Sequence, residues 1–214
     1  VWTREELTRM GEICIRNGVY IVADEIHCEL VFPGNIHIPF ASLSPEFSSH
    51  SVTCNSPSKA FNIAGLQIAN IIVPDNDMRT RIDRAININE VCDVNPFGVE
   101  ALIAAYNEGE EWLSQLLAYL KGNDDFMWDF CRQNLPQFPL TRLEGTYLEW
   151  MDCKTIGLAS AELEKRLIDE AGLWLNAGTM YGAEGEGFMR WNIACPRSRL
   201  TEGLERFRQY ISSL

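Results

Sequence analysis

The stretch TCNSPSKAFNIAGLQ, residues 53–67, decides how the first half of the chain is interpreted. It begins inside the segment Ser51–Asn55, which we predict to be a β-strand. Lys59 follows the strand, between short hydroxyl residues and an apolar turn that contains glycine. A lysine in this position is either a solvated loop residue or an amine held in a partly dry pocket. In the second case desolvation lowers the pKa of the amine, which can then act as a nucleophile.

A second segment, VYIVADEI (Val19–Ile26), is nearly continuously apolar before its final acids. This pattern predicts a strand buried on both faces, as is typical of a parallel sheet. Asp24 lies near its carboxyl end, where open α/β sheets place ligand-binding residues. Because Lys59 follows the next predicted strand, adjacent strands would present a carboxylate and an amine at one sheet edge. An alternative remains that Asp24 only caps the following turn.

Ser56 and Ser58 flank Pro57 directly after the predicted strand. Short hydroxyl groups at a strand end can donate hydrogen bonds to phosphate oxygens, together with nearby backbone N–H groups. The alternative is ordinary turn chemistry around the proline. The presence of Lys59 favours the phosphate interpretation.

Composition narrows the class of function. Lys and Arg number 18 against 30 Asp and Glu, which gives a formal net charge of −12. No basic cluster offsets this charge, so we predict no nucleic-acid partner. The seven cysteines are scattered and form no C-x-x-C pair, which argues against a zinc ribbon or a disulfide framework and favours a reducing compartment. We find no signal-peptide pattern and no apolar run of bilayer length, and therefore predict a cytoplasmic protein without a membrane partner.

The remaining pattern predicts two domains, residues 1–110 and 111–214, joined by a long helix. Thr3 and Glu6 are spaced as a capping box for the first helix, while Gly122 and Asn123 weaken the long one. The predicted helices cover residues 3–18, 77–88, 95–109, 110–134, 159–172 and 198–214, and further strands cover 68–73, 145–152, 173–178 and 187–196.

Four motifs together carry a family resemblance: VADEIHCELVF (22–32), SPSKAFNIAGLQ (56–67), GTYLEWMD (145–152) and GEGFMRWNIACPRSRL (185–200). They resemble the pyridoxal-phosphate enzymes of the aspartate aminotransferase fold, fold type I, and most of all the cystathionine β-lyase-like C–S lyases. The resemblance implies an α/β fold, in which part of the large-domain sheet is followed by an α+β small domain. It also implies pyridoxal 5'-phosphate as the cofactor.

The resemblance implies a role for each candidate residue. Lys59 resembles the lysine that binds the cofactor covalently, and Asp24 resembles the aspartate that pairs with its ring nitrogen. Ser56 and Ser58 resemble residues of the phosphate cup. His27 stands where aminotransferases usually have a tyrosine that contacts the ring hydroxyl. A histidine at this position is similar to the C–S lyase subgroup. A partly buried structural histidine is the alternative for that position.

Arg190 resembles the arginine that binds the substrate α-carboxylate, for which a guanidinium offers both charge and a fixed fork of donors. The alternative is a surface arginine on a strand. Gln67 departs from the family pattern, because many aminotransferases have a phosphate-binding arginine eight positions after the lysine.

The family pattern also has a long segment before the position of Val1, with further cofactor contacts. We therefore expect the chain to be the C-terminal part of a larger protein, or to be completed by another polypeptide. We expect an exposed apolar sheet edge, an uncovered face and little activity from these residues alone.

The implied reaction is β-elimination at the C–S bond of a small sulfur-containing amino acid, such as cystathionine or cysteine, with a thiol, pyruvate and ammonia as products. Three alternatives remain open: transamination, a non-catalytic regulatory module on an aminotransferase-like domain, and an α/β domain whose lysine is incidental. The resemblance further implies a homodimer.

Overall fold

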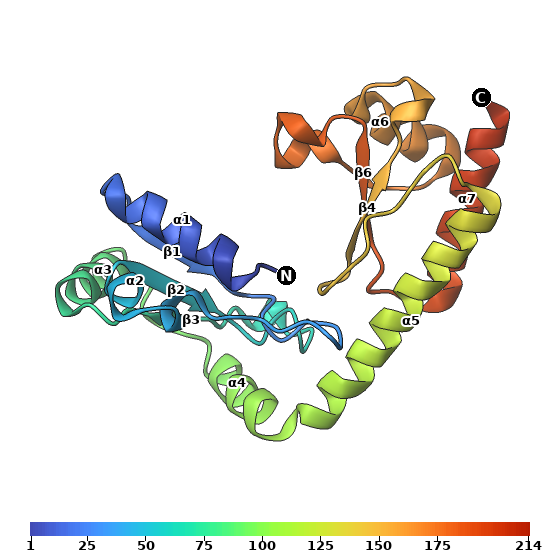
Figure 1. Ribbon diagram of the computed structural model, residues 1–214. Helices are drawn as coiled ribbons and strands as arrows, with labels where there is room; N and C mark the ends of the chain where they lie inside the picture. The colour runs from blue at the N-terminus through green and yellow to red at the C-terminus, as the bar shows by residue number, and fades with distance from the viewer. The chain divides into compact units, whose positions relative to one another are not determined.

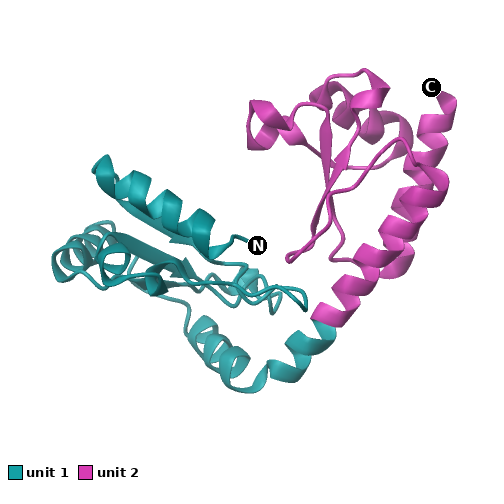
Figure 2. Ribbon diagram, viewed as in Figure 1, with its two compact units in different colours: residues 1–116 teal, residues 117–214 magenta.

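The computed structural model describes residues 1–214, which form two compact units, residues 1–116 and 117–214 (Figure 2). The boundary between the units lies inside the long helix α5 (Glu110–Asn134), which is continuous through Gly122 as predicted. The other helices are α1 (Arg4–Arg16), α2 (Pro45–Ser49), α3 (Asn76–Ile88), α4 (Pro96–Glu108), α6 (Ser160–Ala171) and α7 (Arg197–Ser213). The strands are β1 (Ile21–Asp24), β2 (Ser51–Asn55), β3 (Asn70–Ile72), β4 (Leu148–Asp152), β5 (Asn176–Ala177) and β6 (Phe188–Asn192).

The first unit contains a three-stranded sheet in the order β1-β2-β3 (Figure 1). β1 and β2 are parallel, and Asp24 is the register partner of Cys54. β3 runs antiparallel to β2, so the sheet is mixed, and the parallel pattern inferred from the first strand applies to one pair only. The mixed α/β fold predicted from the sequence is confirmed.

Helix α1 packs on one face of this sheet, and the predicted capping box starts it. Glu6 N donates to Thr3 Oγ1 at 3.2 Å, and Thr3 N donates to Glu6 Oε2 at 2.8 Å. Leu7 is buried with two phenylalanine rings from residues 40–47, and Ile21 of β1 packs against the same cluster. Gly11 allows this close approach, because a Cβ there would lie 2.7 Å from the Phe47 ring.

The prediction that β1 is buried on both faces is wrong. Ile21 and Ala23 face the cluster beneath α1, whereas Val22 is 69% exposed and Asp24 is also exposed. β1 is an edge strand, and within residues 1–116 only one of its faces is covered. The burial of β1 therefore alternates, and its uncovered apolar face agrees with the expectation that these residues alone leave a sheet edge and one face exposed.

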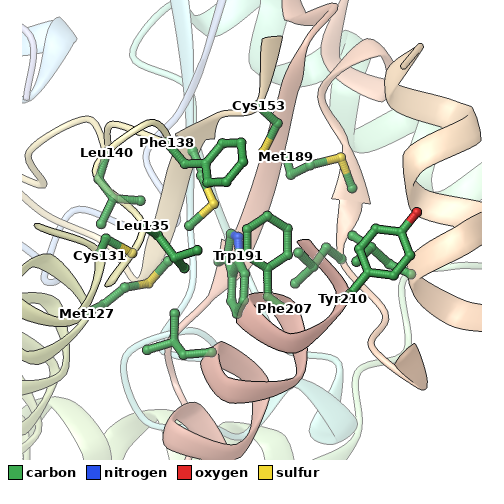
Figure 3. Packing of buried hydrophobic residues seen from close by; sticks show 14 of the residues in the cluster. Met127, Cys131, Leu135, Phe138, Leu140, Cys153, Met189, Trp191, Phe207 and Tyr210 are labelled. Carbon is green, nitrogen blue, oxygen red and sulfur yellow. The ribbon is translucent and has the colours of Figure 1, made fainter. Parts of the chain in front are cut away.

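The second unit packs an antiparallel sheet, in the order β4-β6-β5, against helices. Figure 3 shows its core, where Met189 and Trp191 of β6 meet Phe207 of α7. The Trp191 and Phe207 ring centroids are 5.7 Å apart and nearly perpendicular, a favourable aromatic geometry. No helix of the structure is both long enough and apolar enough to span a membrane.

Asn123, which weakened the helix prediction, has a structural role inside α5. It is buried, and its Nδ2 donates to Ile193 O at 2.8 Å and to Cys195 O at 3.0 Å. Arg197 Nε donates to its Oδ1 at 2.7 Å. The amide thus ties the helix to the segment between β6 and α7, and these bonds offset the low helix propensity of asparagine.

Two carboxyl groups are buried together in the second unit. Asp124 of α5 and Glu149 of β4 are each 0% exposed, and Asp124 Oδ2 lies 2.9 Å from Lys121 Nζ and 3.6 Å from Arg142 Nη1. No protein donor reaches either oxygen of Glu149. Burial, and then the hydrogen bond with Asp124, raise the pKa of Glu149 to about 10. Burial therefore favours the neutral form of Glu149, which carries a proton that it can share with Asp124.

This pair predicts how the stability of the second unit depends on pH. Between the ordinary Glu pKa of 4.5 and about 10, the unfolded chain releases a proton that folded Glu149 retains, so the free energy of unfolding falls as pH rises. Glu149→Gln keeps the shape and a donor but does not titrate. It should flatten this slope and raise the free energy of unfolding at pH 9 by about 1–3 kcal/mol, measured by urea unfolding with tryptophan fluorescence.

Asp125→Asn is the matched control, because Asp125 is more than half exposed beside the same Lys121. It should change the free energy of unfolding by less than about 1 kcal/mol. Parallel pH curves for Glu149→Gln and the wild type between pH 6 and 9 would contradict the shared proton.

Candidate functional site

Asp24 and the turn that carries Lys59 start from the same edge of the first sheet. Asp24 is the last residue of β1, and its register partner Cys54 is one residue from the end of β2. Glu25 N continues the ladder by donating to Cys54 O at 2.8 Å. The adjacency of the two strands, predicted from the sequence, is confirmed. Asp24 Oδ1 accepts a bond from Ile26 N at 3.2 Å, but the side chain remains exposed and can accept further bonds.

Lys59 is half-buried in a turn, residues 57–62, whose backbone is held on both sides. Phe61 N donates to Pro57 O at 2.9 Å, and Trp112 Nε1 donates to Ala60 O at 3.3 Å. Asn62 has a φ of +55°, a left-handed conformation that asparagine tolerates better than most residues. These contacts fix the position of the lysine backbone relative to the end of β2.

The two serines beside Lys59 differ in their hydrogen bonds. Ser56 is 2% exposed; its Oγ donates to Ile68 O at 2.5 Å and accepts from Ser58 N at 3.1 Å. Its one hydroxyl proton is therefore engaged in joining the turn to the segment before β3. The hydroxyl of Ser58 has no partner within the chain, so Ser58 has the freer donor for an anionic ligand.

Glu25 fixes the segment that follows β1, a role that the sequence analysis missed. Its Oε1 accepts from Phe40 N at 2.8 Å, and its Oε2 lies 3.1 Å from His37 Nε2. Burial by itself would raise the pKa of Glu25, but the hydrogen bonds from His37 and Phe40 outweigh burial and lower it. His27 lies in the turn that begins after this acid and is half-buried. The only sequence signal for this role of Glu25 was its position as a second acid directly after Asp24.

Arg190 lies on β6 in the second unit and is half-buried. Its Nη2 donates to Asn176 Oδ1 at 2.9 Å, and its guanidinium carbon lies 4.5 Å from the centre of the Tyr181 ring. The guanidinium therefore contacts Asn176 at one edge and Tyr181 on one face, whereas a surface arginine would contact mainly solvent. The sequence analysis did not single out either of these two neighbours.

The structure thus brings five of the six predicted residues, Asp24, His27, Ser56, Ser58 and Lys59, to one sheet edge and the turns that follow it, and places Arg190 in the second unit. An amine, a carboxylate, an imidazole and a hydroxyl at one edge can hold a ligand that carries both a heteroaromatic ring and an anionic group.

An acid and a lysine turn follow the carboxyl ends of two parallel strands, the position that open α/β proteins use for ligand sites. The family model described as aminotransferase class I and II matches residues 1–207, and the chain belongs to this family.

Individual relatives are similar over nearly the whole chain. It is 42% identical over 211 residues to the cystathionine beta-lyase PatB of Bacillus subtilis, and 33% identical over 205 residues to the protein MalY of Escherichia coli. These matches cover 99% and 95% of this chain, but 54% and 52% of the relatives. The chain therefore spans about half the length of the curated relatives it matches.

Solved structures also match nearly the whole chain. Cystalysin from Treponema denticola, described as containing a pyridoxal 5'-phosphate cofactor, matches with a TM-score of 0.95 and 30% identity over 100% of this chain and 54% of its own. The PLP-bound C-S lyase from Staphylococcus hominis matches with a TM-score of 0.87 and 36% identity over 97% of this chain and 54% of its own.

The different bonding of the two serines predicts different effects of their removal. Ser56→Ala should lower the free energy of unfolding of the first unit by about 1–2 kcal/mol, because Ile68 O and Ser58 N lose a buried partner. Ser58→Ala should change it by less than about 0.5 kcal/mol. Urea unfolding of both variants measures the difference, and equal losses would refute the distinction.

Proposed function

We propose that this chain is the part of a pyridoxal-phosphate-dependent C–S lyase that carries the catalytic lysine. The reaction is β-elimination at the C–S bond of amino acids such as cystathionine or cysteine, which yields a thiol, pyruvate and ammonia. The observation that carries the proposal is the parallel β1–β2 pair, which brings Asp24 and the Lys59 turn to one edge. The 42% identity to a cystathionine β-lyase supports this choice of reaction.

In this proposal the first unit is the C-terminal portion of the cofactor-binding domain, and the second unit is the small domain. The residues present fit pyridoxal phosphate: Asp24 offers an exposed carboxylate for the ring nitrogen, and Ser58 offers an unengaged hydroxyl for the phosphate. Ser56 supports the phosphate site through its bond to Ser58 N. His27, in the turn after β1, would contact the ring hydroxyl. When bound, the cofactor supplies an electron sink for negative charge on the substrate α-carbon.

Lys59 has two successive roles in the proposed reaction. Its Nζ would hold the cofactor covalently before the substrate binds. As a free amine, Lys59 would then take the proton from the substrate α-carbon. The side chain of Asp24 would accept a hydrogen bond from the protonated ring nitrogen. The bond from the β-carbon to sulfur would break with the electron pair leaving on sulfur, and the thiolate would take up a proton to give the thiol. Water would then hydrolyse the remaining three-carbon enamine to pyruvate and ammonia.

Arg190 binds the α-carboxylate of the substrate. A guanidinium provides two parallel N–H donors in one plane, which both neutralises and orients a carboxylate. Its contacts with Asn176 and Tyr181 leave its charge unneutralised, because no carboxylate of the chain is paired with it.

We further propose a cytoplasmic homodimer that binds neither nucleic acid nor membrane. The seven free cysteines and the net charge of −12 support this setting. Transamination is the second candidate reaction, because the chain is also 27% identical to an aspartate aminotransferase of Geobacillus stearothermophilus. The higher identity to the cystathionine β-lyase favours elimination.

The test uses the protein expressed from its full reading frame, mixed with pyridoxal phosphate and cystathionine without any keto acid. Pyruvate should form, and the bound cofactor should give a visible absorption band. Lys59→Ala should abolish both, because it removes the covalent anchor and the base. Lys154→Ala, which changes an exposed lysine, is the control and should retain both.

Each other outcome has a definite meaning. Turnover only when a keto acid is supplied would replace elimination by transamination. A band without turnover would favour a non-catalytic module. A wild-type protein without any band would overturn the cofactor assignment.

Asp24→Asn should keep the visible band but reduce the rate of pyruvate formation by about 100-fold or more, because the neutral amide no longer holds the ring nitrogen cationic. Asp77→Asn, an exposed acid in the first turn of α3, removes the same charge elsewhere and should leave the rate unchanged. Steady-state kinetics at saturating cofactor measure both. A rate within threefold of wild type for Asp24→Asn would contradict the assigned role.

A further inference from the structure

The guanidinium of Arg190 is held by a neighbour on the adjacent strand. Asn176 of β5 is the register partner of Arg190 in the antiparallel β5–β6 pair. This register places the two side chains on the same side of the sheet, where Asn176 Oδ1 accepts from Arg190 Nη2 at 2.9 Å. The pairing of the strands therefore places the two side chains within reach of each other.

A second contact fixes the face of the same group. The guanidinium carbon of Arg190 lies 4.5 Å from the centre of the Tyr181 ring, within cation–π range. Trp150, the β4 register partner of Arg190, packs edge-on against Tyr181 with ring centroids 5.6 Å apart. One hydrogen bond at an edge and one ring on a face together determine the plane of the guanidinium.

The guanidinium retains donors for a ligand. Arg190 Nε is buried and has no hydrogen-bond partner in the chain, and no carboxylate lies within ion-pair distance of the side chain. Asn176 is a neutral acceptor, so it orients Arg190 without cancelling its charge. An aspartate at the same position would form an ion pair with Arg190 and compete with an incoming carboxylate.

We propose that Asn176 is a positioning residue, which orients the guanidinium of Arg190 so that its remaining donors bind the α-carboxylate of the amino-acid substrate. This inference rests on the proposed function. A flexible arginine must lose rotational freedom when it binds a carboxylate, and a preoriented one has already lost it. The contribution of Asn176 is therefore to substrate binding and not to the bond-breaking step.

The consequence is a separation of kinetic constants. Asn176→Ala should raise KM for cystathionine about tenfold and leave kcat within about twofold, because the lost interaction is the same in the ground and transition states. Asn176→Asp should raise KM further, by about 100-fold, because its carboxylate occupies donors of Arg190. Asn192→Ala is the matched control on β6: Asn192 Oδ1 accepts only from Ala194 N, so KM should not change.

A substrate pair separates positioning from a general structural effect. L-cysteine and L-cysteine methyl ester share the amine and thiol, but only the acid presents a carboxylate. In the full-reading-frame protein with its cofactor, Asn176→Ala should lower the acid-to-ester ratio of kcat/KM about tenfold, and Asn192→Ala should leave the ratio unchanged. A structural defect would reduce both substrates alike, so an unchanged ratio in Asn176→Ala overturns the proposal.

A second measurement does not depend on turnover. Phenylglyoxal modification of Arg190, followed by peptide mass spectrometry, should be slowed by propionate and not by propionamide. Asn176→Ala should need about tenfold more propionate for the same protection. Arg132, whose side chain is 73% exposed, serves as the internal reference.

The two measurements distinguish the failure of each hypothesis. If propionate protects Arg190 of the wild type from modification but the wild type converts neither substrate, the proposed reaction fails and the carboxylate site stands. If propionate protects the wild type and Asn176→Ala equally, or protects neither, the positioning role is overturned whatever the activity.

Discussion

The parallel pairing of β1 with β2 is the constraint on which the candidate site depends. Parallel strands end at the same edge of a sheet, so the register of Asp24 with Cys54 places a carboxylate next to the start of the lysine turn although 35 residues separate Asp24 from Lys59. The surrounding bonds maintain this edge on both sides: Glu25 holds the segment after β1, and the hydroxyl of Ser56 holds the turn after β2. Of these two adjacent acids, Asp24 is exposed, whereas Glu25 is engaged by His37 and Phe40 within the chain.

The second unit achieves its order by different means. Its sheet is antiparallel, and the cross-strand partners of Arg190 on both sides, Asn176 and Trp150, define the surroundings of the guanidinium. Asn123 fixes the connection between β6 and α7 from the long helix. Both asparagines accept a hydrogen bond from an arginine through a neutral amide, so neither cancels the charge of its partner.

Local signals in the sequence were sufficient for most elements. The capping box at Thr3, the capping Asn95 and the alternation over residues 148–152 each specify a helix start or a strand without help from distant residues. The adjacency of the first two strands and the mixed α/β fold were also predicted. What could not be predicted were properties that depend on distant partners: the engagement of Ser56 by Ile68, the short helix α2 and the burial of Glu149. The sequence pattern of one chain cannot show which face of an edge strand is covered, or which hydroxyl already donates a hydrogen bond to another part of the chain.

The buried acids in the second unit constrain how this sequence can change through evolution. Replacing Glu149 alone leaves Asp124 beside the cations of Lys121 and Arg142, an arrangement that remains balanced. Replacing Asp124 alone strands an acid in the core with no acceptor for its proton. Position 149 can therefore change to a neutral residue while Asp124 is kept, whereas the reverse order passes through a less stable intermediate.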